Sequence, residues 1–480
     1  MKSTKQYIGL VLGPLLFILI KFFFHPEGLN DEANAILAAT VWVAVWWITE
    51  AIAIPVTALL PIVLFPLSGG ISITETTASY GHKYIFLFLG GFILAIAIEK
   101  WNLHKRIALN IIKIVGTNVR RIILGFMVAT SLLSMWISNT ATAVMILPVG
   151  IAIVLQLQDN PNTKTNENLI FGKALMLAIA YSASIGGMAT LIGTPPNLVL
   201  AGVVENTYHT EITFSQWFMF GFPISIILLI ICWIYLTRFA FKFEQTVFPG
   251  GQKEIEKQLK ALGHMSYEEK VILSIFSLAA IAWISRVFIL SKWLPEIDDT
   301  IIAIIASIVL FIIPKRDKSE SLISWSDAVK LPWGILLLFG GGMALATGFE
   351  VSGLASWLGS QLTSLIGVSV FILLFILIAS VNFLTEITSN MATTAMLLPV
   401  LVALAAVLNI HPYILLVSAT LAASCAFMLP VATPPNAVVF GSGYLNIEDM
   451  VKKGIWMNII SIILVTLIVY FVLPLIWDLN

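Results

Sequence analysis

The chain has 480 residues, of which 59% are hydrophobic and only 11% are charged. Soluble domains carry about 25% charged residues, so this composition excludes an ordinary soluble protein and indicates a membrane protein with many spans. The 26 basic and 26 acidic residues give a net charge of +0, which offers no sign of nucleic-acid binding. Cys232 and Cys425 lie in apolar stretches, and we interpret them as small core residues rather than a disulfide or a metal pair.

Apolar segments recur along the whole chain and predict helices, because a bilayer core needs about 20 apolar residues per helical span. In the first part of the chain they lie at about 6–24, 34–54, 57–67, 84–99, 122–136, 141–157, 173–192 and 217–237. In the second part they lie at about 271–290, 300–314, 331–349, 366–384, 392–409, 412–430 and 454–476. Several are too short to span a bilayer alone, and glycines and prolines interrupt them, which predicts re-entrant hairpins and broken helices.

The charged stretches between these segments predict which loops face the cytoplasm. The stretches at 99–121, 238–270 and 315–320 are basic, and the positive-inside rule places them in the cytoplasm. The stretches at 25–34 and 294–299 are acidic and are expected outside. We expect 238–270 to be a cytoplasmic hydrophilic connector between two halves, 1–237 and 271–480.

Three pairs of similar strings indicate that the two halves are repeats. The string GGFILAIAIE at 90–99 resembles GGMALATGFE at 341–350, and SNTATAVMILPV at 138–149 resembles SNMATTAMLLPV at 389–400, so that both pairs are 251 positions apart. The string GTPPNLVLAG at 193–202 resembles ATPPNAVVFG at 432–441, 239 positions later. Any two membrane helices share leucine and isoleucine, but shared Ser-Asn and Thr-Pro-Pro-Asn strings indicate an internal duplication.

The charges around the two Ser-Asn motifs predict that the repeats are inverted. Basic residues precede the first motif at 100–121, whereas the counterpart at 351–367 has none. This asymmetry fits a first hairpin that enters from the cytoplasm and a second that enters from outside, as in many transporters. We expect the hairpins at about 122–157 and 366–409 and the broken helices at about 173–205 and 412–445.

The repeated polar motifs predict a binding site, because polar groups in lipid are costly unless they are satisfied or functional. A helix that begins at a Ser-Asn motif points its free N–H groups and its positive dipole end at the motif, which suits an anion. The turn also exposes oxygens that suit Na⁺, and the paired prolines break a helix and free its carbonyls. Capping or helix packing is the alternative role for such residues, but two copies, each followed by a break, favour a site. No Lys or Arg lies inside these motifs, which indicates co-transport of an anion with cations.

Acidic residues inside apolar stretches leave proton coupling open as an alternative. Glu50 is a candidate proton relay, although a structural role at a helix end is favoured, and Glu99 and Glu350 are expected to be structural helix-end residues. Glu386 stands where Met135 stands in the first half; we expect it to be paired or near water, with an open role. The six histidines form no metal-binding spacing and no catalytic motif occurs in a supporting context, so we expect that the chain is not an enzyme.

The string WWITEAIAIPVTALLPIVLFPLSGG at 46–70, the two Ser-Asn motifs and the two Thr-Pro-Pro-Asn motifs together resemble the divalent anion/sodium symporter family. Its members carry C4-dicarboxylates, citrate or sulfate, and the resemblance covers roughly residues 42–440. It implies an all-α polytopic membrane protein with an inverted repeat, two re-entrant helical hairpins and two discontinuous helices. It also implies a homodimer in the bacterial inner membrane, in which an elevator-type transport domain moves against a scaffold, with Na⁺ as the coupling ion.

The same resemblance implies the residues of the site by matching position. The first sodium site would use Ser134, Ser138, Asn139 and Gly193, and the second would use Thr385, Thr388, Asn390 and Ala432. The substrate carboxylates would meet Ser138, Asn139, Thr140, Thr194 and Pro195 on one side and Ser389, Asn390, Met391, Thr433 and Pro434 on the other. Met391 departs from the family, which has a threonine there, so that a thioether replaces a hydroxyl donor, and we expect it to alter recognition of the acid.

Three functions remain open at this point. The favoured hypothesis is a Na⁺-coupled importer of C4-dicarboxylates and of citrate. A proton-coupled carrier or a Na⁺-independent organic-anion exchanger on the same fold is the alternative, with Glu50 and Glu386 as its candidate proton carriers. An anion channel is the third hypothesis, but two cation sites are not needed for conduction.

Overall fold

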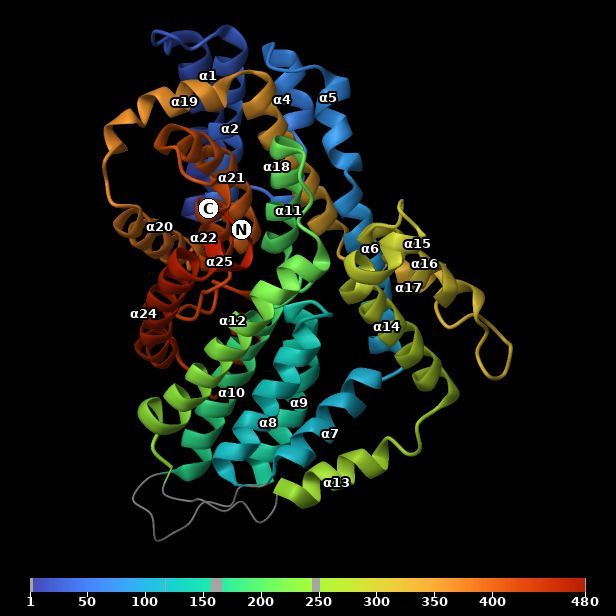
Figure 1. Cartoon of the computed structure of the whole chain (residues 1–480). Helices are drawn as coiled ribbons and strands as arrows, with labels where there is room; N and C mark the ends of the chain where they lie inside the picture. Colours follow the sequence, from blue (N-terminus) through green and yellow to red (C-terminus); the bar gives the residue numbers. More distant parts are fainter. Residues whose placement is uncertain (1–2, 117, 157–165, 244–250, 480) are drawn as a thin grey trace.

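The computed structural model describes residues 3–116, 118–156, 166–243 and 251–479 (Figure 1). Within these ranges the chain forms helices, and the β-type pairing is limited to an isolated bridge between Pro314 and Ser321. Ten helical stretches in the described residues are long and apolar enough to cross a membrane. The all-α polytopic class predicted from the sequence is therefore confirmed.

The helices of the first part of the chain are α1 (Thr4–Phe23), α2 (Asp31–Thr49), α3 (Ile54–Thr57), α4 (Leu60–Ser68), α5 (Ile73–Ala78), α6 (Lys83–Lys100), α7 (Leu103–Val115), α8 (Val119–Ser134), α9 (Asn139–Gln156), α10 (Glu167–Gly187), α11 (Pro195–Tyr208) and α12 (Phe214–Ile234), which a π-helical turn continues at Tyr235–Ala240. Those of the second part are α13 (Gly251–Ala261), α14 (Tyr267–Ser285), α15 (Ser291–Trp293), α16 (Asp299–Ile312), α17 (Trp325–Ala328), α18 (Trp333–Val351), α19 (Leu354–Gln361), α20 (Val370–Thr385), α21 (Asn390–Leu408), α22 (Pro412–Ala423), α23 (Pro434–Phe440), α24 (Ile447–Phe471) and α25 (Leu473–Ile476).

The segments predicted from apolar runs fall on helices, but several bounds differ. The runs at 34–54 and 173–192 extend beyond α2 and α10, which end at Thr49 and Gly187. The run at 57–67 is split, because α3 ends at Thr57 and α4 begins at Leu60. The run predicted at 412–430 ends as a helix at Ala423. The residues beyond it are apolar but form the break before α23, and an apolar run alone does not reveal where its helix stops.

The apolar runs missed several helices, among them α7 and α13. Helix α7 is amphipathic: it buries Leu103, Leu109 and Ile112 and exposes Lys105 and Lys113. Helix α13 lies inside the predicted hydrophilic connector and packs against α7 and α9. Both have a narrow apolar stripe on a polar helix, which a search for continuous apolar runs does not detect.

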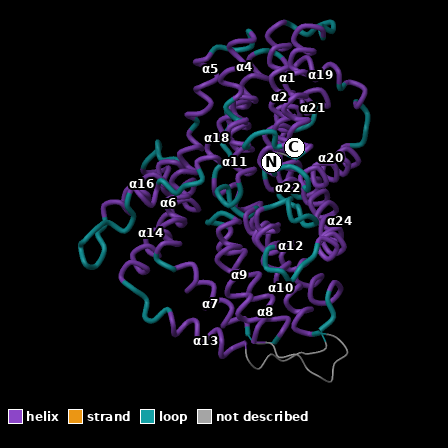
Figure 2. The backbone as a smooth tube through the Cα atoms, turned by 180° about the vertical axis from the view of Figure 1, so that it is seen from behind, coloured by secondary structure: helices purple, strands orange, loops and turns teal. Residues whose placement is uncertain are grey.

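The structure repeats its elements in the order predicted from the string pairs, since α6 to α12 correspond to α18 to α24. In each half a helix of 16 residues, α8 or α20, is followed by a short turn and the longer helix α9 or α21. The α8–α9 hairpin lies in the lower half of Figure 1 and the α20–α21 hairpin in the upper half, and the view from behind in Figure 2 agrees. The two hairpins thus approach the middle of the molecule from opposite ends.

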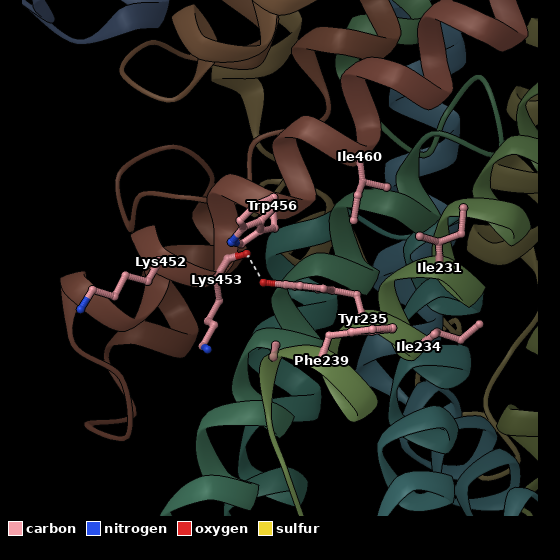
Figure 3. Close-up of a pocket in the computed structure, with 9 residues that line it drawn as sticks. Ile231, Ile234, Tyr235, Phe239, Lys452, Lys453, Trp456 and Ile460 are labelled. Atoms are coloured by element: carbon pink, nitrogen blue, oxygen red, sulfur yellow. Dashed lines mark hydrogen bonds between the residues drawn. The ribbon is translucent and has the colours of Figure 1, made fainter.

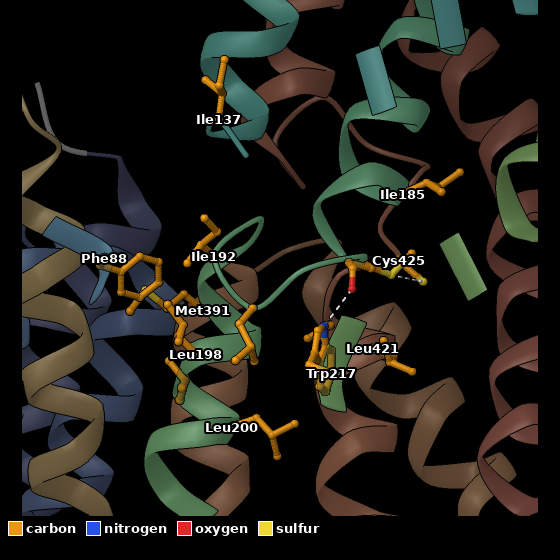
Figure 4. Packing of buried hydrophobic residues seen from close by; sticks show 14 of the residues in the cluster. Phe88, Ile137, Ile185, Ile192, Leu198, Leu200, Trp217, Met391, Leu421 and Cys425 are labelled. Carbon is orange, nitrogen blue, oxygen red and sulfur yellow. Dashed lines mark hydrogen bonds between the residues drawn. The ribbon is translucent and has the colours of Figure 1, made fainter. Parts of the chain in front are cut away.

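Helix α10 forms the centre of the packed core. It contacts α8, α9, α12 and α23, and the first break that follows it is held by Trp217, whose Nε1 donates to the Met188 carbonyl at 3.0 Å (Figure 4). The Cys425 thiol lies 3.8 Å from the Met188 sulfur, and both cysteines are buried and free. Their interpretation as core residues is confirmed.

Candidate substrate and cation site

The tips of the two hairpins are helix N-termini. Helix α8 ends at Ser134 and α9 begins at Asn139, while α20 ends at Thr385 and α21 begins at Asn390. Ser138 Oγ accepts from the Ala141 N–H at 3.2 Å, so part of the first motif does cap its helix. The Ser389 side chain makes no capping hydrogen bond to α21. The first turn of α21 therefore presents free N–H groups to its surroundings.

The asparagines of the two Thr-Pro-Pro-Asn motifs donate hydrogen bonds to backbone carbonyls of the two helix breaks. Asn197 Nδ2 donates to the carbonyls of Gly187, at 3.3 Å, and Thr190, at 2.8 Å. Asn436 Nδ2 donates to the corresponding carbonyls of Ala426, at 3.3 Å, and Leu429, at 3.0 Å. Each asparagine thus links two carbonyls of its break, of which those of Thr190 and Leu429 also accept a backbone N–H, from Gly193 and Ala432. No role was predicted for these asparagines from the sequence, although their recurrence in both motifs was a signal.

A cavity of about 550 Å³ lies where the hairpin tips and the helix breaks meet, within the range of about 300–1,000 Å³ typical of small-molecule sites. All ten predicted substrate-contacting residues line it: Ser138, Asn139, Thr140, Thr194, Pro195, Ser389, Asn390, Met391, Thr433 and Pro434. Its remaining wall includes Phe88, Phe92, Ile335 and Leu338 from α6 and α18. Ile192 and Met391 line the cavity as well, and Figure 4 shows their side chains together with that of Phe88.

Among the described residues, no basic side chain lines this cavity. Glu50 is its one acidic residue, and its other polar groups are hydroxyls, amides and backbone. A carboxylate in this cavity would therefore meet helix N-termini and hydroxyl or amide donors rather than Lys or Arg, so its charge needs cations nearby.

The first cluster of oxygens lies at the tip of the α8–α9 hairpin. One end of the Asn139 amide is 2.5 Å from Ser134 Oγ, 3.2 Å from the Ala183 carbonyl and 3.3 Å from the Gly193 carbonyl. With nitrogen in this position the amide donates to all three; with oxygen there, four oxygens converge, which is the arrangement that a bound cation stabilises. A Cβ on Gly187 would lie 2.6 Å from Asn139 Oδ1, so the close approach requires glycine.

The second cluster repeats this geometry at the tip of the α20–α21 hairpin. Thr385 Oγ1 lies 2.7 Å from Asn390 Oδ1 and 3.0 Å from the Ala423 carbonyl. The predicted ligand Ala432 also lines the cavity. The Thr388 hydroxyl, in contrast, lies 2.9 Å from the Leu384 carbonyl and 2.6 Å from Thr393 Oγ1, so it has other partners.

The carbonyls of Ala183 and Ala423, which complete the two clusters, were not predicted from the sequence. A backbone oxygen becomes available only through the fold, because alanine in a membrane helix carries no chemical signal of its own. Of the residues that the family resemblance implies, Ser134, Asn139 and Gly193 meet in the first cluster, and Thr385 and Asn390 meet in the second.

Glu386 lies under the second helix break and is only 3% exposed. Its carboxylate accepts from the N–H groups of Phe427, Met428 and Leu429 at 2.8, 3.0 and 2.9 Å. Asn458 Nδ2 donates to it at 2.7 Å. The prediction of a paired residue is confirmed, and its role is to satisfy the backbone of the break.

The other acidic residues lie at helix ends. Glu50 is the C-cap of α2 with φ 51°, and it also lines the cavity. Glu99 and Glu350 lie in the last turns of α6 and α18, as expected of repeat-related residues.

Comparison with known proteins assigns the family. The model of the sodium:sulfate symporter transmembrane region matches residues 4–477. The chain belongs to this family. It is accordingly a multi-pass transport protein of the bacterial plasma membrane and not an enzyme.

Curated relatives cover nearly the whole chain. The sodium-dependent dicarboxylate transporter SdcS of Staphylococcus saprophyticus is 49% identical over 478 residues, which are 98% of this chain and 92% of the relative. SdcS of Staphylococcus aureus is 50% identical over 480 residues, with 99% and 92% covered.

Two solved structures share the fold at low sequence identity. The YdaH transporter of Alcanivorax borkumensis matches with a TM-score of 0.60 at 12% identity, covering 99% of this chain and 98% of its own. MtrF of Neisseria gonorrhoeae matches with a TM-score of 0.57, also at 12% identity, covering 98% and 96%. These matches support the fold.

Proposed function

We propose that this protein imports C4-dicarboxylates together with Na⁺. The observation that carries the proposal is the pair of matching oxygen clusters beside a cavity that has no basic side chain. Cations in these clusters would offset the charge of a dianion that Lys or Arg does not neutralise. The names of the SdcS relatives, at 49% and 50% identity, point to the same cargo and the same ion.

The residues at the two hairpin tips would bind both the sodium ions and the substrate. Ser134, Asn139 and Gly193 would hold one Na⁺, and Thr385, Asn390 and Ala432 the other. The first turns of α9 and α21 would direct their N–H groups to the two substrate carboxylates, with the Thr140 and Thr433 hydroxyls as further donors. Asn139 and Asn390 belong both to the proposed Na⁺ ligands and to the proposed substrate contacts. Sodium binding would therefore fix the hairpin tips in the geometry that binds substrate, which couples the transport of the two.

We further propose an elevator-type mechanism in a homodimer. The hairpins α8–α9 and α20–α21, with the broken helices, would form the transport domain, and α1 to α6 and α14 to α18 would belong to the scaffold. The two parts meet at the cavity, where apolar Phe88, Phe92, Ile335 and Leu338 face the polar tips. Because these apolar side chains form no hydrogen bonds or ion pairs with the tips, the transport domain could move along them without breaking such bonds.

Citrate is proposed as a second substrate. Met391 puts a flexible thioether where the family has a hydroxyl, and the cavity of about 550 Å³ leaves room for a third carboxylate.

Proton coupling or Na⁺-independent exchange on the same fold is the second candidate. Glu50 is the residue that favours it, because it is the acidic residue that lines the cavity. Glu386 is less suited to carry protons, since four donors already bind its carboxylate.

The deciding experiment is uptake of labelled succinate into proteoliposomes, with an inward Na⁺ gradient or with K⁺ in its place. We expect accumulation only with Na⁺, and competition by unlabelled citrate. Equal uptake in K⁺ would overturn sodium coupling and favour the second candidate, which a pH gradient across the same vesicles would then test.

A further inference from the structure

A second crevice lies between the end of α12 and the start of α24, and it shares no residue with the substrate cavity. Its volume is about 480 Å³ (Figure 3). It is lined by Ile231, Ile234, Tyr235, Phe239, Ala240, Lys452, Lys453, Trp456 and Ile460. The side chains thus divide into an apolar wall and two ammonium groups.

The π-helical turn that ends α12 shapes the apolar wall. Such turns shift side chains from their helical positions and are frequent at functional sites. The Tyr235 hydroxyl donates to the Lys453 carbonyl at 2.9 Å, which fixes α12 against α24 (Figure 3). Phe239 and Trp456 remain 73% and 57% exposed. Large exposed aromatics at helix ends are typical of the membrane–water interface.

The two lysines give the crevice a positive end. The Lys453 ammonium lies 5.5 Å from the centre of the Phe241 ring, and no ion pair joins it to a carboxylate of the described residues. Lys452 pairs with Glu448 in the preceding helical turn, but the two side chains are 70% and 71% exposed. Water screens such a pair strongly, so both lysines are available to an anion.

The position of the crevice along the chain indicates the leaflet that it faces. The end of α12 leads directly into the basic connector at 238–270, which we expect in the cytoplasm. The cytoplasmic leaflet carries the anionic lipids that basic segments attract. A contact with another copy of the chain is a poorer fit, because protein interfaces are depleted in charged residues at their cores and in lysine generally.

We propose that this crevice binds one anionic phospholipid. Lys452 and Lys453 receive the phosphate of the headgroup, while an acyl chain lies along Ile231, Ile234 and Ile460. Phe239 and Trp456 flank the boundary between the two parts. The lipid bridges two helices that follow the broken helices in their respective halves, so it would stabilise their packing without entering the substrate cavity.

Native mass spectrometry of the purified full chain tests the proposal, with phosphatidylglycerol and phosphatidylcholine added separately to delipidated protein. We expect phosphatidylglycerol to bind about tenfold more tightly, since each lysine near an anionic headgroup strengthens binding by a factor of about three to five. Lys452→Ala/Lys453→Ala should remove this preference. Lys105→Ala/Lys113→Ala, which removes two exposed charges from α7, is the matched control and should keep it.

A second variant tests the apolar part of the crevice. Ala240→Phe leaves both lysines in place but adds a bulky side chain at a residue that lines the crevice, and we expect it to weaken phosphatidylglycerol binding. Equal affinity of the wild-type chain for the two lipids would overturn the proposal. An undiminished preference in Lys452→Ala/Lys453→Ala would do so as well, because the preference would then arise from another surface.

Discussion

The two hairpin tips keep the same oxygens although their sequences differ. In the first half a serine hydroxyl joins an asparagine amide at 2.5 Å and a helix carbonyl at 2.7 Å. In the second half a threonine makes the same two contacts at 2.7 and 3.0 Å. Asn197 and Asn436 also bind equivalent carbonyls of their breaks. Duplication has preserved the atoms that surround the cavity.

The support beneath the two breaks has not been preserved. Under the second break Glu386 receives three backbone N–H groups and the Asn458 amide. In the first half methionine, Met135, stands at the matching position, and its backbone carbonyl accepts from Thr190 Oγ1 at 2.5 Å. The first break is therefore held by neutral groups and the second by a buried charge. The atoms that line the cavity are thus more alike in the two halves than the groups that support the breaks.

The largest effect is expected from removing an atom common to both tips. Asn139→Ala and Asn390→Ala each delete an amide from an oxygen cluster, and each should lower Na⁺-driven uptake more than about 100-fold, because even partners behind metal ligands cost 10–100-fold. Uptake per unit of protein in proteoliposomes measures this. Asn110→Ala, which deletes an amide bonded only within α7, is the control. Wild-type uptake in either tip variant would contradict the site.

An intermediate effect is expected where the two halves differ. Glu386→Gln places an NH₂ group or a single neutral oxygen against three N–H donors, so at least one donor loses its acceptor, at a cost of about 1–3 kcal/mol. Thr190→Val is the matching change in the first half and removes a single neutral hydrogen bond, worth about 1 kcal/mol. Thermal unfolding in detergent should show the larger decrease in melting temperature for Glu386→Gln. Equal decreases would mean that the charge adds nothing to the second break.

The hairpin tips could be predicted from the sequence, whereas the groups that support the helix breaks could not. The duplicated strings predicted both hairpins and both breaks, because polar residues are costly in apolar helices and rarely recur there without a function. The ten substrate-contacting residues were implied by the family resemblance, and all of them line the cavity. The carbonyls of Ala183 and Ala423 could not be foreseen, since backbone atoms converge only when distant helices pack. The partners of Glu386 could not be foreseen either, because Phe427 to Leu429 form part of an apolar run that is typical of a helix. Helices α7 and α13 were not predicted from the apolar runs, because their apolar faces are narrow.

The smallest effect is expected at the position where the two motifs differ, which is Met391 in the second tip and Thr140 in the first. Met391→Thr would return a hydroxyl donor to the second tip, and one hydrogen bond of about 0.5–1.5 kcal/mol changes an affinity by roughly 2- to 10-fold. We expect the ratio of succinate to citrate affinity to shift by such a factor in favour of succinate, because the hydroxyl fixes one carboxylate and the shorter side chain removes the flexible wall. Competition of unlabelled acids against labelled succinate measures the ratio.

Met396→Thr is the matched control for this change, since it makes the same substitution on α21 at a residue that does not line the cavity. An unchanged ratio in Met391→Thr would show that the second tip binds substrate through its backbone N–H groups alone. The two tips would then be equivalent in substrate recognition despite their different third residues, and selectivity would have to arise from the apolar wall formed by Phe88, Phe92, Ile335 and Leu338.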